Sequence, residues 1–254
     1  QARRSRGQAA VEYLYVIPIL LILLFGAIQF TFIYEAKLTL NEAVFTGTRQ
    51  GALNNGSMAA IQDGLEAGLT PLFTHGVNLQ ALKDGRTAAH QLLSGTTPQL
   101  ATTWIVNPNS AALSGFAQTQ YDGSSAIPND NLMYRDPTAL NGGMNVQDAN
   151  LLKVRVSICY PMVVPIINRI IYTVVSGLPT TPVLIDSSSY GGQSIAAPEL
   201  LKSGINGTAT GPNCPVPDTT DANGTVHNYS ITITSEAVVR MQSPFADPGS
   251  WSFP

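Results

Sequence analysis

The chain has 254 residues, and only 11% of them are charged, against about 25% in typical soluble proteins. A net charge of −3 predicts no nucleic-acid-binding surface. The length suits one membrane helix and one further domain, and the low charge favours an exported surface protein over a cytoplasmic one.

An uncharged, mostly apolar run extends from Tyr13 to Tyr34. As a helix of about 22 residues it would be about 33 Å long, which is enough for a hydrocarbon core of about 30 Å. Arg3, Arg4 and Arg6 precede the run, and no comparable basic cluster follows it. The positive-inside rule then predicts a cytoplasmic N-terminus and a chain that continues across the membrane.

Two details distinguish this run from a removable signal peptide or a simple anchor. It is followed by Tyr34-Glu35-Ala36-Lys37 and not by a small-residue cleavage site, so no conventional signal peptide is expected. Glu12 stands at the cytoplasmic mouth of the run, where a carboxylate is costly in lipid and needs a partner. The alternative is a glutamate favoured only by the dipole at a helix start.

These residues resemble the class III signal of type IV prepilins, since four residues separate Gly7 from Glu12-Tyr13 and an apolar helix follows. More narrowly, the chain resembles TadE-like pseudopilins of the tight-adherence (Flp) pilus system. The stretches that carry this resemblance are Gly7-Gln8-Ala9-Ala10-Val11-Glu12-Tyr13, Pro18, Phe25-Gly26, Arg49-Gln50-Gly51-Ala52, Lys153–Pro161, Val164–Asn168 and Val238–Pro244.

The resemblance implies cleavage between Gly7 and Gln8 by a prepilin peptidase. Glu12, with Tyr13 beside it, would then serve subunit assembly by neutralising the new α-amino group of its own or a neighbouring chain. An ammonium and a carboxylate are each unfavourable in a low dielectric but tolerable as a pair. The implied protein is a pseudopilin or minor pilin, without catalytic residues or a cofactor.

The same resemblance implies partners and a location. The partners are membrane lipid, the prepilin peptidase, other pilins and pseudopilins, and the inner-membrane assembly platform of the pilus. The location is the bacterial inner membrane, crossed once, with a periplasmic C-terminal domain, and in or at the tip of a surface pilus.

The sequence predicts three parts: a basic leader over 1–7, an N-terminal helix over 8–53 with its transmembrane part at 13–34, and an extracytoplasmic domain over 54–254. The helix should continue past Tyr34 because Leu38, Ala43 and Val44 keep helical spacing. Gly51 and then Asn54-Asn55-Gly56 indicate its end.

The domain is predicted to be α+β, with short helices packed on a small antiparallel sheet. Apolar residues alternate over 152–158 and 229–241, so these two segments should be paired strands. Short helices are expected over 58–69 and 78–93, a short strand over 104–106, and long loops over about 107–150 and 178–226.

Residues 165–176 carry a wide apolar helix face made of isoleucines and valines. At about 12 residues this helix is too short to span a membrane. It is either a core helix against the sheet, which the pattern favours, or an interfacial helix.

Cys159 and Cys214 both lie outside the cytoplasm in the predicted topology, where disulfides form and persist. The two cysteines allow one pairing, Cys159–Cys214, and the alternative is two separate buried thiols. Their separation, without a nearby pair of histidines, matches no zinc-site spacing.

No motif of a known catalytic family is present, and His75, His90 and His227 are far apart in the sequence. The sequence therefore favours an assembly protein. A membrane-anchored extracytoplasmic hydrolase and a surface binding module remain as alternatives. Cleavage after Gly7 would favour the assembly protein over both, and a catalytic cleft would favour the hydrolase.

Overall fold

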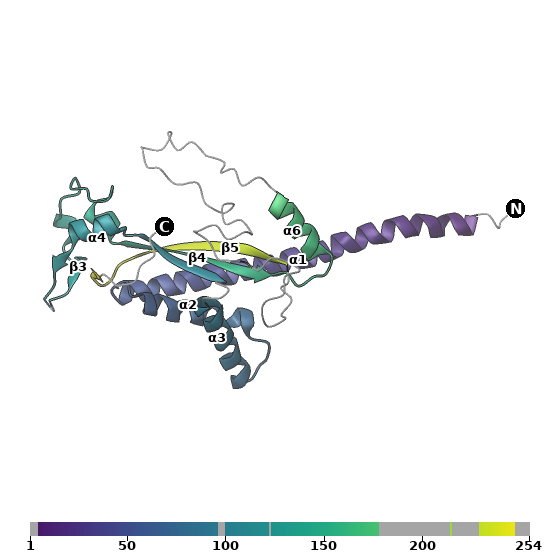
Figure 1. The fold of residues 1–254 in the computed structure, drawn as a ribbon, viewed down its shortest axis with the longest axis horizontal. Coiled ribbons are helices and arrows are strands. Elements are labelled where there is room, and N and C mark those ends of the chain that lie inside the picture. Colours follow the sequence, from purple (N-terminus) through teal and green to yellow (C-terminus); the bar gives the residue numbers. More distant parts are fainter. Residues whose placement is uncertain (1–4, 96–99, 122, 178–213, 215–228, 247–254) are drawn as a thin grey trace.

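The computed structural model describes residues 5–95, 100–121, 123–177, 214 and 229–246. One long helix, α1 (Ser5–Leu53), runs through the molecule. Its N-terminal half projects freely, and its C-terminal half is built into a domain of helices and antiparallel sheet (Figure 1). The α+β class expected from the sequence is confirmed.

Helix α1 is continuous through Pro18. It begins at Ser5, before the Gln8 at which the sequence predicted its start, since Gly7 does not break it. At its other end Asn55 and Gly56 adopt positive φ angles of 57° and 75°. The N–H of Gly56 donates to the carbonyl of Gly51, so an exposed end of the helix is capped where the sequence predicted a stop.

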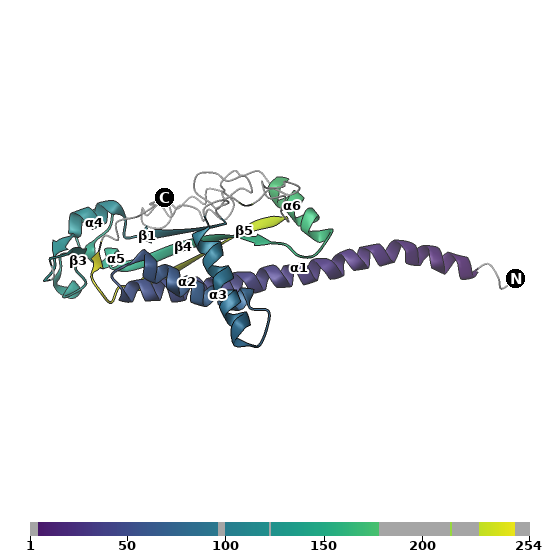
Figure 2. The ribbon, with the colours of Figure 1, turned by 60° about the horizontal axis from the view of Figure 1, so that its bottom comes forward.

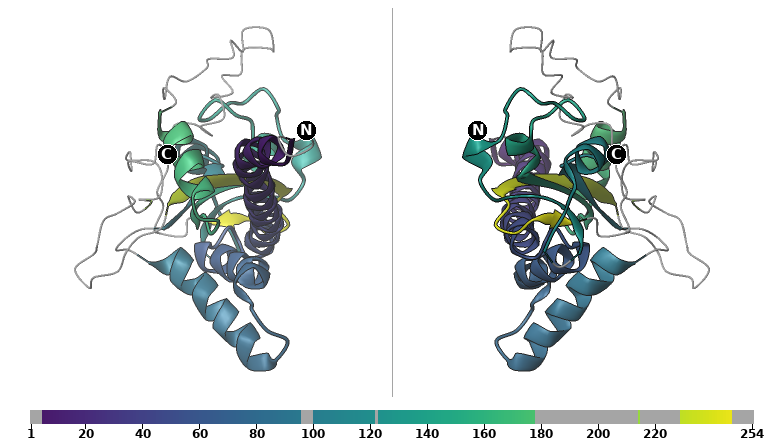
Figure 3. Two further views of the ribbon diagram at one scale, coloured as in Figure 1. Left: turned by 90° about the vertical axis from the view of Figure 1, so that its right-hand side faces the viewer. Right: turned by 90° about the vertical axis from the view of Figure 1, so that its left-hand side faces the viewer.

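Two further helices follow this turn. Helix α2 (Met58–Phe73) runs back along α1, and α3 (Leu79–Ser94) slants away from the pair (Figure 3). Asn78 caps α3, because its Oδ1 accepts a hydrogen bond from the N–H of Ala81 at 2.8 Å. Both helices were predicted; α2 extends past its expected end at Leu69 through Pro71.

Small residues bring α1 and α2 into backbone contact. A Cβ added to Gly64 would lie 2.6 Å from the Cα of Gly47, and one added to Gly68 would lie 2.4 Å from the Cα of Ala43. Gly64 and Gly68 are one helical turn apart, as are Ala43 and Gly47. Such small-residue pairs allow close helix packing, so this contact has no room for larger side chains.

The main sheet is antiparallel and has the strand order β1-β4-β5. Its strands are β1 (Ala101–Asn107), β4 (Leu151–Pro161) and β5 (Ser230–Arg240). The pairing of β4 with β5 sets Leu152 opposite Val239 and Ile158 opposite Ile233. The two strands predicted to pair are therefore confirmed as neighbours, and the short strand expected over 104–106 is part of β1, which pairs with the other edge of β4.

Helix α1 covers one face of this sheet, in contact with β4 and β5, and α2 packs against α1 (Figure 2). Alternate residues of β4 point into the layer between the helices and the sheet, while Lys153 and Arg155 point away. Burial of each large aliphatic side chain contributes about 1.5–3 kcal/mol. The centre of this core is formed by Ala36, Leu40, Ala43, Val44, Ile61, Leu65, Leu69, Leu152, Val154, Val156 and Ile158.

The prediction of a nearly structureless loop over about 107–150 is wrong. This segment forms α4 (Ser110–Phe116), β2 (Gln118–Thr119), β3 (Ser125–Ile127), the short helix η1 (Leu132–Tyr134) and α5 (Val146–Ala149). The elements are too short to show a periodic pattern. Asn109 and Asn145 cap α4 and α5, and β3 pairs with β6 (Phe245–Ala246) to form a second small sheet.

Helix α6 (Ile167–Gly177) is not the core helix that the pattern favoured. Ile167 is buried, but Ile170, Val174 and Val175 are exposed. The helix lies at the end of the domain nearest the projecting half of α1 (Figure 1). An apolar face fits lipid as well as it fits a protein core, so periodicity alone could not separate the two. The other predicted loop, over 178–226, falls almost wholly outside the described residues.

Candidate functional site

The projecting half of α1 exposes an apolar surface on all sides. Every side chain from Glu12 to Phe25 is exposed, and all those after Glu12 are uncharged. Helix α1 from Glu12 to Leu53 is, within the described part of the chain, the one helix long and apolar enough to cross a membrane. So large an apolar surface is unfavourable in water and requires lipid or other apolar helices around it.

The residues predicted for processing and assembly all lie on this projecting end. Gly7 and Gln8 lie in the first turns of α1, and Glu12 and Tyr13 follow with exposed side chains. Within the described residues, the carboxylate of Glu12 has no hydrogen-bond or ion-pair partner. The fold therefore leaves Glu12 available to a group outside the domain.

Gln29 joins this apolar half to the domain. Its side chain is completely buried, and its Oε1 accepts a hydrogen bond from the backbone N–H of Val164 at 2.8 Å. Val164 precedes α6, so this bond ties the α6 end of the domain to α1 inside the uncharged run. Among the described residues, the Nε2 of Gln29 is buried and has no hydrogen-bond partner, and a buried donor left in this way lowers the stability of the fold.

Sequence reasoning missed Gln29. The signal was present, since a glutamine stands inside a run of uncharged and mostly apolar residues. Polar side chains in such segments usually have a partner in the protein. What the sequence could not supply was that partner, because Val164 is separated from it by 135 positions.

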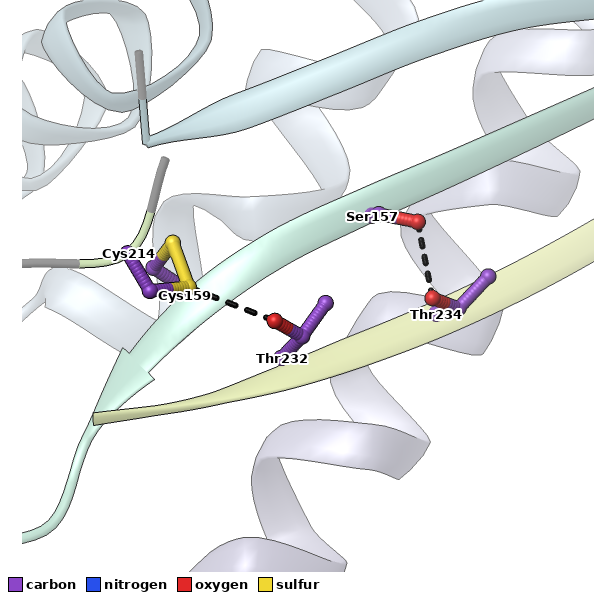
Figure 4. The surroundings of a disulfide bond; sticks show 5 residues. All are labelled: Ser157, Cys159, Cys214, Thr232 and Thr234. Atoms are coloured by element: carbon purple, nitrogen blue, oxygen red, sulfur yellow. Dashed lines mark hydrogen bonds between the residues drawn. A yellow bond between two sulfur atoms is a disulfide. The ribbon is translucent and has the colours of Figure 1, made fainter. Parts of the chain in front are cut away.

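The predicted disulfide is present near the C-terminal end of β4, the central strand of the main sheet. Cys159 in β4 and Cys214 have Cα atoms 5.4 Å apart and a bonded S–S pair (Figure 4). The Thr232 hydroxyl lies 3.3 Å from the Cys214 sulfur, and Ser157 pairs with Thr234 on the same face. The bond fixes Cys214 onto the end of β4 that leads into α6, at the end of the domain nearest the projecting half of α1.

Charged side chains join α1 to β5 and β5 to β4. The Lys37 ammonium donates to the carbonyl of Thr234, and burial lowers its pKa although Glu236 acts in the opposite sense. Burial alone would raise the pKa of Glu236, but hydrogen bonds from Lys153 and Arg155 outweigh it, so that pKa lies below its usual value. These contacts hold β4 and β5 in register.

The two described histidines show no catalytic arrangement. The Nδ1 of His90 lies 2.5 Å from Glu66 Oε1, which joins α3 to α2, while His75 stands in the loop between those helices. In the described ranges, no group of three His, Cys, Asp or Glu residues is placed to hold a metal ion. His227 lies outside the described residues.

Comparison with known proteins identifies the N-terminal segment. The family model described as TadE-like protein matches residues 7–49, which cover the predicted cleavage point and most of α1. No curated protein and no solved structure matches the chain. The TadE-like resemblance predicted from the sequence is confirmed over residues 7–49, which lie within α1.

Proposed function

We propose, from the TadE-like match of residues 7–49, that this protein is a membrane-anchored pseudopilin or minor pilin that takes part in assembling tight-adherence pili. The observation that carries the proposal is the form of α1. One helix combines an exposed apolar half, headed by Glu12, with a half that is built into a folded domain.

In this proposal a prepilin peptidase cuts between Gly7 and Gln8. A peptidase at the membrane face has to seat the chain just before the apolar helix, and a glycine before the cut allows close backbone approach. Cleavage would remove Arg3, Arg4 and Arg6 with the leader and leave Gln8 as the new N-terminus. Glu12 would then be one helical turn from the new ammonium.

Glu12 supplies the counter-charge for that ammonium, in its own chain or in a neighbour, while Tyr13 packs beside it. A charge pair in a low dielectric is far less costly than either charge alone. The exposed position of Glu12, without a partner within the described domain, supports a role between subunits. A glutamate needed only for its own fold would gain from a partner there.

An exposed apolar stripe along α1 supports contact with other pilins. Phe30, Tyr34, Leu38 and Phe45 follow one another at helical spacing and are all exposed. The stripe continues from the uncharged run past Glu35 and Lys37, so it extends beyond the proposed span. A helix surface of this kind fits the helix of another pilin or pseudopilin, or a component of the assembly platform.

The proposed topology puts residues 13–34 across the bacterial inner membrane once, with 1–7 as a basic leader on the cytoplasmic side and 54–254 as the periplasmic domain. The arginines before the run support this orientation. The protein then stays in the membrane as an assembly factor or enters the pilus, in its shaft or at its tip.

The test compares two acidic residues of the same helix. Glu12→Ala should leave insertion and cleavage largely intact but abolish pilus formation, because breaking a buried pair costs about 3–5 kcal/mol. Glu42→Ala, at an exposed position in the domain half of α1, is the matched control and should assemble normally. If Glu12→Ala also assembles like wild type, Glu12 is only a helix-start acid.

A further inference from the structure

The segment from Val163 to Val175, which includes α6, presents apolar side chains that the domain does not cover. Val163 is 69% exposed, Ile166 65% and Val174 58%, and Ile170 and Val175 are also exposed. Val164, just before α6, and Ile167, in its first turn, are buried and attach the segment to the domain. The exposed residues therefore belong to a firmly attached element.

The position of this segment along α1 sets its depth. The backbone of Val164 is bonded to Gln29, which lies five residues before Tyr34, the last residue of the uncharged run. At 1.5 Å per residue, the bond lies about 7 Å inside the apolar end of α1. In-plane amphipathic helices bury their apolar face about 5–10 Å into the boundary between headgroups and acyl chains.

The orientation of α6 agrees with that depth. The helix runs steeply across the direction of α1, at the end of the domain that faces the projecting half (Figures 1 and 2). Seen from the N-terminal side, α6 lies beside α1 with no other helix or strand of the described fold in front of it (Figure 3). A membrane crossed by α1 would meet this segment before any other helix of the domain.

The charge of the segment also suits lipid. From Met162 to Val175 there is no acidic residue, and the one charged side chain is the exposed Arg169. Arg169 is about 100° or more around the helix from Ile170 and Val174, given 100° per residue. A guanidinium there can reach headgroup phosphates while the aliphatic side chains enter the acyl region.

We propose that residues 163–175 form an interfacial anchor: the turn and α6 insert into the lipid surface from which α1 emerges and hold the domain against the membrane. The hydrogen bond from Val164 to Gln29 holds the segment beside the uncharged run of α1, at the depth of the lipid surface, which favours lipid over a separate protein partner. The proposal rests on α1 crossing the membrane, as the proposed function requires.

The test uses the full chain in vesicles of phosphatidylethanolamine and phosphatidylglycerol. The photocrosslinking residue p-benzoylphenylalanine replaces Val174, or Leu24 in the projecting half of α1 as a span control, or Leu82 on α3 as a domain control. All three side chains are exposed, at 58%, 50% and 50%. Lipid adducts are then measured by mass spectrometry.

The proposal predicts lipid adducts at Val174 and Leu24 and only background at Leu82. Adducts at Leu24 alone would overturn the interfacial anchor and leave the membrane span intact. Protein–protein adducts at Val174 in place of lipid adducts would overturn it in favour of a protein partner, and equal adducts at all three positions would show that lipid contact is not specific to α6. No adduct at Leu24 would contradict the membrane span, and with it the proposed function.

Discussion

The two halves of α1 share one unbroken helix and differ in what surrounds them. From Glu12 to Phe25 all side chains are exposed, whereas Ala36, Leu40, Ala43 and Val44 are completely buried against α2 and the sheet. The exposed half is apolar on every side. The buried half packs one apolar side on the domain, and its exposed side carries charged residues such as Glu42 and Arg49 beside the apolar Leu38 and Phe45.

This difference shows how the residues of one helix suit two surroundings, lipid along one half and a folded domain in water along the other. A segment that faces lipid needs no polar side, so its apolar residues are not periodic. A segment that packs on a domain in water needs one apolar stripe, and small residues such as Gly47 where a second helix crosses closely. Gln29 lies at the change from one environment to the other. Changes in the two halves should therefore have separable effects.

The largest effect on the domain half is expected from loss of the disulfide. The double variant Cys159→Ser, Cys214→Ser removes a cross-link between residues 55 apart, which the chain-entropy model values at about 4 kcal/mol. Urea unfolding in detergent, followed by tryptophan fluorescence, measures this loss, and membrane insertion should be unchanged. Free thiols in the oxidised, denatured wild-type protein would contradict the pairing.

A smaller loss is expected where α1 meets α2. Gly68→Ala puts a methyl group within 2.4 Å of the Cα of Ala43, and such overpacking costs about 1–3 kcal/mol. Gly26→Ala is the control in the projecting half, since a Cβ at Gly26 has nothing within 4 Å in the described structure. Equal unfolding midpoints for the two variants would show that the α1–α2 contact is not close.

Gln29 tests the junction of the two halves. Gln29→Leu leaves the buried N–H of Val164 without an acceptor, which should cost about 1–3 kcal/mol. Faster hydrogen exchange at the start of α6 would locate the effect. The control is Gln50→Leu at an exposed position of the domain half. If exchange near Val164 is unchanged, the bond from α6 to α1 is absent in solution.

The smallest expected effect is the pH dependence of β4–β5 pairing. Glu236 has a lowered pKa in the folded state. Its contribution to the free energy of unfolding is therefore present above the unfolded-state pKa of about 4.5, and it is lost as the pH falls through the folded-state pKa. For a partly exposed carboxylate the contribution is below about 1 kcal/mol. Glu236→Gln should flatten the decline in unfolding midpoint below pH 4.5, and an unaltered decline would assign it to other groups.

Prediction from the sequence succeeded where a pattern was clear and depended on neighbouring residues alone. The run from Tyr13 to Tyr34, the stop at Asn54-Asn55-Gly56 and the alternation in β4 and β5 each follow from local residues. The short elements over 107–150 did not, because they are too short to show a period, and β3 also depends on a partner far along the chain, β6.

The candidate site was predictable in part. The sequence identifies Gly7, Gln8, Glu12 and Tyr13 through their resemblance to a known signal, and their roles remain proposals. It could not identify the contact of Gln29 with Val164, since no local pattern encodes a partner so distant. Nor could it decide what α6 packs against, because an apolar face has the same periodicity toward lipid and toward protein.

The central claim is that the projecting half of α1 is a prepilin-type signal cut between Gly7 and Gln8. Mass spectrometry of the N-terminus, from cells with and without the prepilin peptidase, tests it directly, with Gly7→Val beside the wild type. We expect a chain that begins at Gln8 only when the peptidase is present and the residue before the cut is Gly7. The same N-terminus in both kinds of cell, or normal cleavage of Gly7→Val, would contradict it.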